Sequence, residues 1–293
     1  MTKFNHYSSL YLEFKKYELK PSTLEKYTSI VKDRLNPYFG EFEVSEIKPS
    51  TIKKWLYNID DVGTKSKKHY LGVLSGILQE SLYDELIHRN PVRAIKPPQY
   101  TRPTIKPFNA DEVNLIMSNS ENSNYRYYLA IAFYTGMRSG EIIGLKKSDI
   151  DFKNKIISIK RTRSRFGEST PKTKLSIRDI PIIELLMPYI IELYNLHDNE
   201  YLFITQYKKP YRDTHTFVES HWKPSLKDLG IEYRRPYNTR HTYATNMLYN
   251  NLVTPVQLAQ LLGHSSTKMV FDVYVNYIDS YNDDFDRSIS IYK

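Results

Sequence analysis

The sequence contains no cysteine among its 293 residues, which excludes disulfides, iron–sulfur clusters, thiolate zinc sites and a cysteine nucleophile. It also lacks an apolar run near the roughly 18 residues that a membrane span requires. The first residues carry no signal-peptide core. Neither a Gly-rich phosphate loop nor a carboxylate cluster suited to Mg²⁺ is present. We therefore expect a soluble, cytoplasmic protein with no membrane partner, no metal and no other cofactor.

The residues that are abundant carry positive charge. The 42 lysines and arginines exceed the 33 acidic residues, so the formal net charge is +9, which suits a polyanionic partner without identifying it. Four prolines between residues 97 and 107 interrupt the chain and favour an extended strap. We predict a first, helical domain at 1–93, a linker at 94–107 and a second domain at 108–293.

The first domain has the apolar spacing of four or five helices. Ser22 and Glu25 have capping-box spacing ahead of one helix, and Ser50 is placed to cap another. We expect Asn36-Pro37 to stop the first of these helices. A longer helix is predicted from about residue 64 to 87.

The second domain has a mixed pattern. Alternating residues over 155–161 and a second run over 175–182 predict two strands of a hairpin with a long loop. Helical patterns surround this hairpin, at 111–117, 125–134, 183–196, 239–249, 255–262 and about 267–274. This half is therefore expected to be mostly helical with one small sheet.

Residues 135–141, Thr-Gly-Met-Arg-Ser-Gly-Glu, join two of these helices. The two glycines allow a tight turn and a close backbone approach. The planar guanidinium of Arg138 could there bind two oxygens of a phosphate at once. The alternative is that Arg138 only pairs with Glu141, and this segment alone favours that simpler explanation.

A second segment, residues 160–178, is densely basic and lies on the predicted hairpin. Alternate side chains of a strand share a face, so several could line one groove and bind a phosphate backbone. The alternative is a charged, soluble sheet edge. The basic residues are Lys160, Arg161, Arg163, Arg165, Lys172, Lys174 and Arg178, against the single acid Glu168.

Two further segments place polar side chains at helix ends. Arg240 follows Pro236 in a predicted helix N-terminus, a position that favours anions, although plain helix capping explains this segment as well. His264 follows Gly263, which is placed to end a helix, and Tyr274 comes ten residues later. A single histidine at a helix junction is usually structural.

Taken in order, the segments TGMRSGEIIGL, PKTKLSIRDIPI, NTRHTYAT and LLGHSS with a following DVY resemble the tyrosine recombinase, or phage integrase, family. The resemblance covers about residues 107–280. The helical first part with its Pro-rich linker is similar to the core-binding domain of that family. The resemblance implies a mainly α fold with a small antiparallel β-sheet: a SAM-like N-terminal bundle and an α+β catalytic domain.

In that family two arginines, a hairpin lysine, two histidine positions and a tyrosine surround one scissile phosphate. The motifs match Arg138 and Arg240 to the arginines that bind the non-bridging oxygens in the transition state. Glu141 is expected to support them by charge pairing. Lys172 matches the general acid that protonates the leaving 5′-oxygen. Lys174 remains the nearby alternative.

The other roles fall near the C-terminus. His264 matches a histidine that donates a hydrogen bond to the phosphate, and Tyr274 matches the nucleophile, with Tyr277 and Tyr281 as alternatives. The sequence departs from the family three residues before the second arginine, where Tyr237 replaces the usual histidine. A phenol, with a pKa near 10, is a poor proton acceptor at neutral pH. If Tyr237→Phe leaves cleavage unchanged, this hydroxyl has no catalytic role.

The resemblance implies strand cleavage to a 3′-phosphotyrosine and resealing by a 5′-hydroxyl, without metal or ATP. Its substrate would be double-stranded DNA with a specific recombination site. For lysines of the first domain, a solvated helix end is an equal alternative to phosphate contact. The candidate DNA contacts are Lys53, Lys54, Lys65, Lys67, Lys68, Arg161, Arg163, Arg165 and Lys174.

The segment after Tyr274 carries several acids, which make it a poor DNA contact. The resemblance implies that this tail docks on a neighbouring protomer and so helps to assemble a tetramer on DNA. Removal of residues 279–293 is then expected to weaken synapsis more than DNA binding. Accessory directionality or host factors are further expected partners, and the protein would be nucleoid-associated when bound to DNA.

Several functions are compatible with these residues. The favoured one is integration and excision of a mobile element; the alternatives are a Xer-like chromosome or plasmid dimer resolvase, a relaxing topoisomerase and a non-catalytic DNA-binding relative. The last is supported only by Tyr237. A covalent protein–DNA adduct separates the enzymes from the binding protein, and recombination between two sites separates a recombinase from a topoisomerase.

Overall fold

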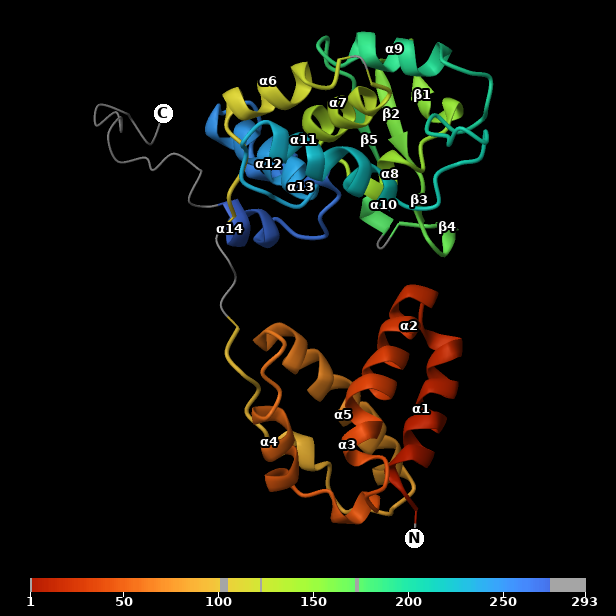
Figure 1. Cartoon of the computed structure of the whole chain (residues 1–293), viewed down its shortest axis with the longest axis vertical. Coiled ribbons are helices and arrows are strands. Elements are labelled where there is room, and N and C mark those ends of the chain that lie inside the picture. The colour runs from red at the N-terminus through yellow and green to blue at the C-terminus, as the bar shows by residue number, and fades with distance from the viewer. Residues whose placement is uncertain (1, 101–104, 122, 172–173, 275–293) are drawn as a thin grey trace, which may run out of the picture. The chain divides into compact units, whose positions relative to one another are not determined.

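The computed structural model describes residues 2–100, 105–121, 123–171 and 174–274, and it divides the chain into two compact units, Met1–Pro103 and Thr104–Lys293. Each unit is built around buried apolar side chains of its own. Figure 1 shows the helices and strands of the two units. The predicted class, mainly helical with small antiparallel sheets, is confirmed. Within the described part of the chain, no helix is long and apolar enough to cross a membrane.

Unit 1 is a helical bundle. Its α-helices are α1 (Phe4–Glu18), α2 (Pro21–Ile30), α3 (Asn36–Phe39), α4 (Pro49–Tyr57) and α5 (Thr64–Tyr83), with a π-helix at Val31–Leu35 and 3₁₀ turns at Val44–Glu46 and Pro91–Ala94. The long helix α5 supplies Leu74, Ile77 and Leu78, all fully buried, to the core. Their three-and-four spacing places them on one helix face, as the sequence pattern predicts.

Both predicted N-caps of this unit are wrong by two residues. Helix α2 begins at Pro21 with Lys20 as its N-cap, and α4 begins at Pro49 with Lys48 as its N-cap. The reason is proline itself, because its fixed φ and missing N–H suit the first position of a helix. Ser22 therefore lies inside its helix and cannot cap it.

The predicted stop at Asn36-Pro37 is also wrong, because the helix continues through a π segment into α3. At this point the N–H of Asn36 donates to Val31 O, five residues back rather than four. The next residue, Pro37, has no N–H to place. The wider π turn therefore carries the helix past the proline at a change of hydrogen-bond register.

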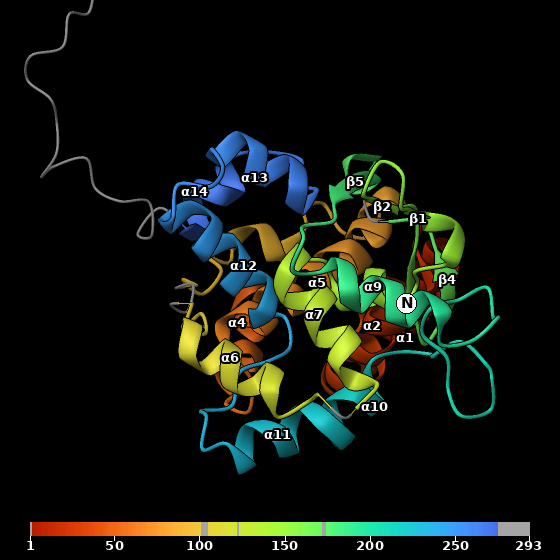
Figure 2. The same ribbon diagram turned by 90° about the horizontal axis from the view of Figure 1, so that it is seen from above.

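Unit 2 contains the remaining helices. They are α6 (Ala110–Ser118), α7 (Tyr125–Thr135), α8 (Ser139–Ile142), α9 (Met187–Asn195), α10 (His215–Phe217), α11 (Lys223–Asp228), α12 (Asn238–Tyr249), α13 (Pro255–Leu262) and α14 (Lys268–Tyr274), with 3₁₀ turns at Lys147–Asp149 and Lys174–Ser176 and a π-helix at Val218–Trp222. Helix α7 is apolar nearly all round and lies in the core beside α12 (Figure 2). The short helices α10 and α11 have no counterpart in the sequence prediction.

Among the described residues, the strands form two small antiparallel sheets. One has the order β1 (Ile150–Asp151), β2 (Ile156–Ile159), β5 (Arg178–Pro181), and the other pairs β3 (Thr162–Ser164) with β4 (Gly167–Ser169). The predicted long-looped hairpin is confirmed by the β2–β5 pairing, with Ile157 opposite Ile180. The second predicted strand is shorter than expected, because residues 174–176 form a 3₁₀ turn.

Candidate active site

Arg138 lies at the turn between α7 and α8. Helix α7 ends at Gly136, whose φ of +62° favours glycine; a Cβ there would lie 2.5 Å from the ring of Tyr243. The Arg138 N–H donates to Glu141 Oε2 at 2.9 Å, and its Nη1 donates to Oε1 at 2.8 Å. The Arg138 side chain stays 34% exposed, so its guanidinium remains accessible to a phosphate.

Glu141 is buried and has a second partner that sequence reasoning did not assign to it. Arg178 reaches it from β5, with Nη2 donating to Oε2 at 3.0 Å and Nη1 to Oε1 at 3.3 Å. Burial alone would raise the pKa of Glu141, but the charges and hydrogen bonds of Arg178 and Arg138 outweigh it and lower that pKa. Arg178 Nε also donates to Leu261 O, so this side chain joins α8, β5 and α13.

Arg240, on α12, is 1% exposed. Its Nη1 donates to Gly136 O at 2.7 Å and its Nη2 donates to Leu262 O at 2.5 Å, so two helix ends hold the guanidinium. Burial and the charge of Arg138 lower the pKa of Arg240 to about 10, which leaves it protonated at neutral pH. Among the described residues, its Nε has no hydrogen-bond partner.

His264 follows Gly263, which ends α13 with a φ of +65°. Its Nε2 lies 3.0 Å from Nη2 of Arg240, a group that can only donate. Burial and the neighbouring arginines lower the pKa of His264 to about 4, so the ring is neutral and Nε2 accepts. The remaining proton is therefore on Nδ1, which is buried and has no partner within the described ranges.

Tyr274, at the end of α14, is 2% exposed. Its hydroxyl lies 2.8 Å from Nδ1 of His241, a residue that the sequence analysis did not select. Burial raises the pKa of Tyr274, so its hydroxyl is protonated. Burial and Arg240 lower the pKa of His241 to about 4, so its imidazole is neutral. The only sequence signal for His241 was its place directly after Arg240.

Tyr237 lies one helical turn before His241 and is 44% exposed. Its ring meets the ring of His241 edge to face, with centroids 5.0 Å apart. The structure therefore brings the predicted residues Arg138, Glu141, Arg240, His264 and Tyr274 together from three helices and two helix junctions, and it places Tyr237 at their edge.

Comparison with known proteins identifies the family of this chain. A model of the phage integrase family matches residues 106–280, and a model of the phage integrase N-terminal SAM-like domain matches residues 3–58. The chain belongs to the phage integrase family. The resemblance on which the sequence analysis depended is thereby confirmed.

The chain is similar to a curated relative in sequence and to solved structures in fold. The chain is 30% identical over 200 residues to the tyrosine recombinase XerC-like protein of Caldanaerobacter subterraneus subsp. tengcongensis, in a match covering 59% of this chain and 51% of that one. It therefore spans about half of that relative. In fold, it is similar to the Tn1549 transposon integrase in complex with a circular intermediate DNA (TM-score 0.82, 17% identity, 94% and 95% coverage). It is also similar to the λ integrase tetramer bound to a Holliday junction (TM-score 0.74, 20% identity, 91% and 79% coverage).

The basic residues of the hairpin differ in their contacts within the protein. Arg161 pairs with buried Asp149. Arg163 donates from Nε to Tyr211 O at 3.0 Å. Arg165 lies over the ring of Phe166. The structure thus gives Arg161 and Arg163 roles within the protein.

Two hairpin lysines are the candidates for the general acid. Lys172 lies outside the described residues, and Lys174 begins a 3₁₀ turn. Their predicted roles, as general acid and as its alternative, stay predictions. The tail at 279–293 also lies outside the described residues.

The predicted DNA-contact lysines of unit 1 lie on two helices. Lys53 and Lys54 are exposed on α4, and Lys65 and Lys68 are exposed on α5, whereas Lys67 is half-buried. Lys65 and Lys68 also border a cavity of about 410 Å³ that includes Tyr27, His69 and Tyr100. Exposed ammonium groups beside aromatic rings suit contact with a nucleic acid backbone.

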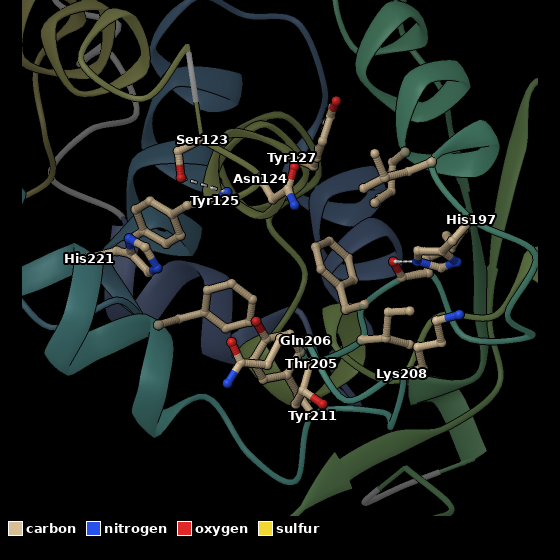
Figure 3. A pocket seen from close by; sticks show the side chains of 16 residues that line it. Ser123, Asn124, Tyr125, Tyr127, His197, Thr205, Gln206, Lys208, Tyr211 and His221 are labelled. Carbon is tan, nitrogen blue, oxygen red and sulfur yellow. Dashed lines mark hydrogen bonds between the residues drawn. The ribbon is translucent and has the colours of Figure 1, made fainter.

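A separate pocket of about 520 Å³ includes Tyr125 and Tyr127 at the start of α7, whereas Arg138 follows the end of this helix. Figure 3 shows Tyr125 beside His221 on one side and His197 on the other, and the first two rings stack with centroids 4.9 Å apart. None of the predicted site residues lines this pocket. We therefore do not assign it to the active site.

Proposed function

We propose that this chain is a site-specific tyrosine recombinase that cleaves and rejoins double-stranded DNA through a 3′-phosphotyrosine at Tyr274. One observation carries the proposal: two arginines, a histidine and a buried tyrosine, distant in sequence, converge around the ends of α7 and α13. A phosphodiester needs charge neutralisation and a nucleophile held in line, and these side chains can supply both.

The arginines would stabilise the pentacoordinate phosphate. Arg138 has an accessible guanidinium whose position is fixed by Glu141. Arg240 is fully buried, and Nε remains available to a bound oxygen. His264, neutral with its proton on Nδ1, can donate a further hydrogen bond. Because Arg240 and Tyr274 are both buried, reaction requires the scissile phosphate to gain access to them.

The leaving 5′-oxygen would take its proton from Lys172, with Lys174 as the alternative. A 5′-hydroxyl then attacks the phosphotyrosine and reseals the strand. The energy of the broken phosphodiester is kept in the covalent link, so the reaction would need no ATP, and the charges of the arginines and the lysine would take the place of a metal ion. This proposal includes cytoplasmic action on DNA at the nucleoid.

Mobile-element integration and excision is the biological role that we propose, because the similar Tn1549 protein is the integrase of a transposon. A Xer-like dimer resolvase is the second candidate, favoured by the identity with the XerC-like protein. By analogy with the λ tetramer on a Holliday junction, we propose a DNA-bound tetramer joined through the tail. Accessory factors belong to the same proposal.

A covalent-capture experiment tests the chemistry without knowledge of the target site. The protein is incubated with a pool of nicked duplexes of randomised core sequence, in EDTA and without nucleotide. Denaturant-resistant adducts are recovered, the captured DNA is sequenced, and the phosphotyrosyl peptide is identified by mass spectrometry. We expect a peptide linked at Tyr274 and no adduct with Tyr274→Phe. Salt-sensitive DNA binding without an adduct would support the non-catalytic alternative.

A further inference from the structure

Position 237 holds a tyrosine in place of the usual histidine, and His241, one helical turn later, lies beside Tyr274. Tyr237 is the N-cap of α12 and His241 lies four residues later, so the two side chains lie on the same face of this helix. The ring of Tyr237 touches His241, and His241 Nδ1 reaches the Tyr274 hydroxyl at 2.8 Å. The histidine thus lies between the phenol at position 237 and the predicted nucleophile.

The protonation states of the two groups allow Tyr274 to donate this hydrogen bond. The charged and titratable groups around His241 are Arg240, Tyr237, His264 and Tyr274, and burial together with the charge of Arg240 keeps the imidazole neutral. The Tyr274 hydroxyl is protonated and can donate or accept, and a neutral imidazole accepts at the nitrogen that carries no proton. In the tautomer with its proton on Nε2, His241 accepts the hydrogen bond from Tyr274 at Nδ1, and this is the tautomer that proton transfer requires.

We propose that His241 is the catalytic base that positions Tyr274 and accepts its proton during attack on DNA, an inference that rests on the proposed function. As the bond between Tyr274 Oη and phosphorus forms, the proton passes from Oη to His241 Nδ1. The bond between phosphorus and the 5′-oxygen breaks, and the separate acid protonates that oxygen. In the resealing step His241 returns the proton to Tyr274.

The developing bond makes this transfer favourable although a free phenol is a weak acid. The phenolic oxygen loses basicity as it bonds to phosphorus, and the negative phosphate beside the ring stabilises an imidazolium. The imidazole also orients the nucleophile, because its ring is held between Tyr237 and the end of α14. A residue at this position acts directly on the reacting oxygen.

The test compares His241→Asn with a matched control, His221→Asn, at an exposed histidine of the same unit. Asparagine keeps an amide near the place of Nδ1 but cannot take up a proton at neutral pH. We expect the single-turnover rate of adduct formation to fall about 100-fold or more in His241→Asn, the usual contribution of general base catalysis. DNA affinity should stay within about twofold, and His221→Asn should cleave normally.

A sulfur substrate separates the base from the acid. DNA with sulfur in place of the bridging 5′-oxygen has a leaving group that needs no proton, so it should restore cleavage to Lys172→Ala and leave His241→Asn slow. Cleavage by His241→Asn within about threefold of wild type on ordinary DNA would overturn the inference while leaving the proposed function intact. Absence of any adduct with wild type would overturn both.

A measurement on the wild-type chain covers the case in which His241→Asn does not fold. With ¹⁵N-labelled histidine, the Nδ1 resonance of His241 should show an unprotonated, hydrogen-bonded nitrogen at pH 7. This signal should change in Tyr274→Phe, which removes the donor. A protonated Nδ1 in the wild-type protein, or a signal unaffected by Tyr274→Phe, would overturn the inference.

Discussion

Glu141 offers the sharpest test of how this site is held together. The carboxylate is 3% exposed and accepts four hydrogen bonds, two from Arg138 and two from Arg178, at 2.8 to 3.3 Å. Glu141→Gln keeps the shape but removes the charge, and it turns one acceptor into a donor that faces a guanidinium. Removing one partner of a buried ion pair costs about 3–5 kcal/mol, because it leaves buried charge uncompensated.

The assay is guanidinium chloride unfolding at pH 7 with a probe specific to unit 2. The chain has two tryptophans, Trp55 in unit 1 and Trp222 in unit 2, so a Trp55→Phe background leaves fluorescence that reports only the unit containing the site. The control is Glu192→Gln, which removes an exposed pair with Arg126, with side chains 50% and 29% exposed.

We expect Glu141→Gln to lose about 3 kcal/mol or more and Glu192→Gln to lose about 1 kcal/mol at most. Adduct formation should fall in Glu141→Gln as well, because Arg138 loses the group that fixes its position. Equal, small losses in the two variants would refute the reasoning, since they would show that burial of Glu141 adds nothing to the energy of its pairs.

Three further predictions follow from the same contacts. His241 and His264 have pKa values lowered to about 4, so between pH 6.5 and 4 the unfolded chain binds more protons than the folded chain. The free energy of unfolding therefore decreases as the pH is lowered through this range, by about 2 kcal/mol for each histidine at pH 4.5. His241→Asn should lose its share of that fall; an unchanged difference between denaturation at pH 7 and pH 4.5 would contradict this. Gly136→Ala should cost at least about 1 kcal/mol in thermal or chemical unfolding, because φ is +62° and the added Cβ has no room; a neutral change would argue against the turn geometry. Lys65→Gln should weaken DNA binding equally for all sequences and reduce the slope of log affinity against log salt by about 1, whereas an unchanged slope would remove Lys65 from the interface.

Much of the fold could be predicted because periodicity and turn residues are local properties. The pattern in α7 and the proline and glycine that bound α13 are written in adjacent residues, and the structure confirms both elements. The errors at Ser22 and Ser50 came from a choice between two local signals, in which a proline at the first helical position prevails over a capping serine. The π turn before Pro37 had no such local signal.

Part of the candidate site could be predicted from the sequence, and part could not. The order and spacing of the segments around Arg138, Arg240, His264 and Tyr274 are enough to predict which side chains gather. Two partners could not be found from the sequence, because each depends on how distant elements pack. Arg178 reaches Glu141 from a strand 37 residues away, and His241 meets Tyr274 across 33 residues.

By itself, the sequence determined the helical class, the family and the principal phosphate-binding candidates, since these follow from residue types in a fixed order. Only the tertiary structure decided which side chain of α12 meets the nucleophile. Tyr237 and His241 are one helical turn apart and share a face. Which of them meets Tyr274 therefore depends on where along the axis of α12 the end of α14 packs. That packing places Tyr274 against the imidazole and leaves the phenol of Tyr237 44% exposed.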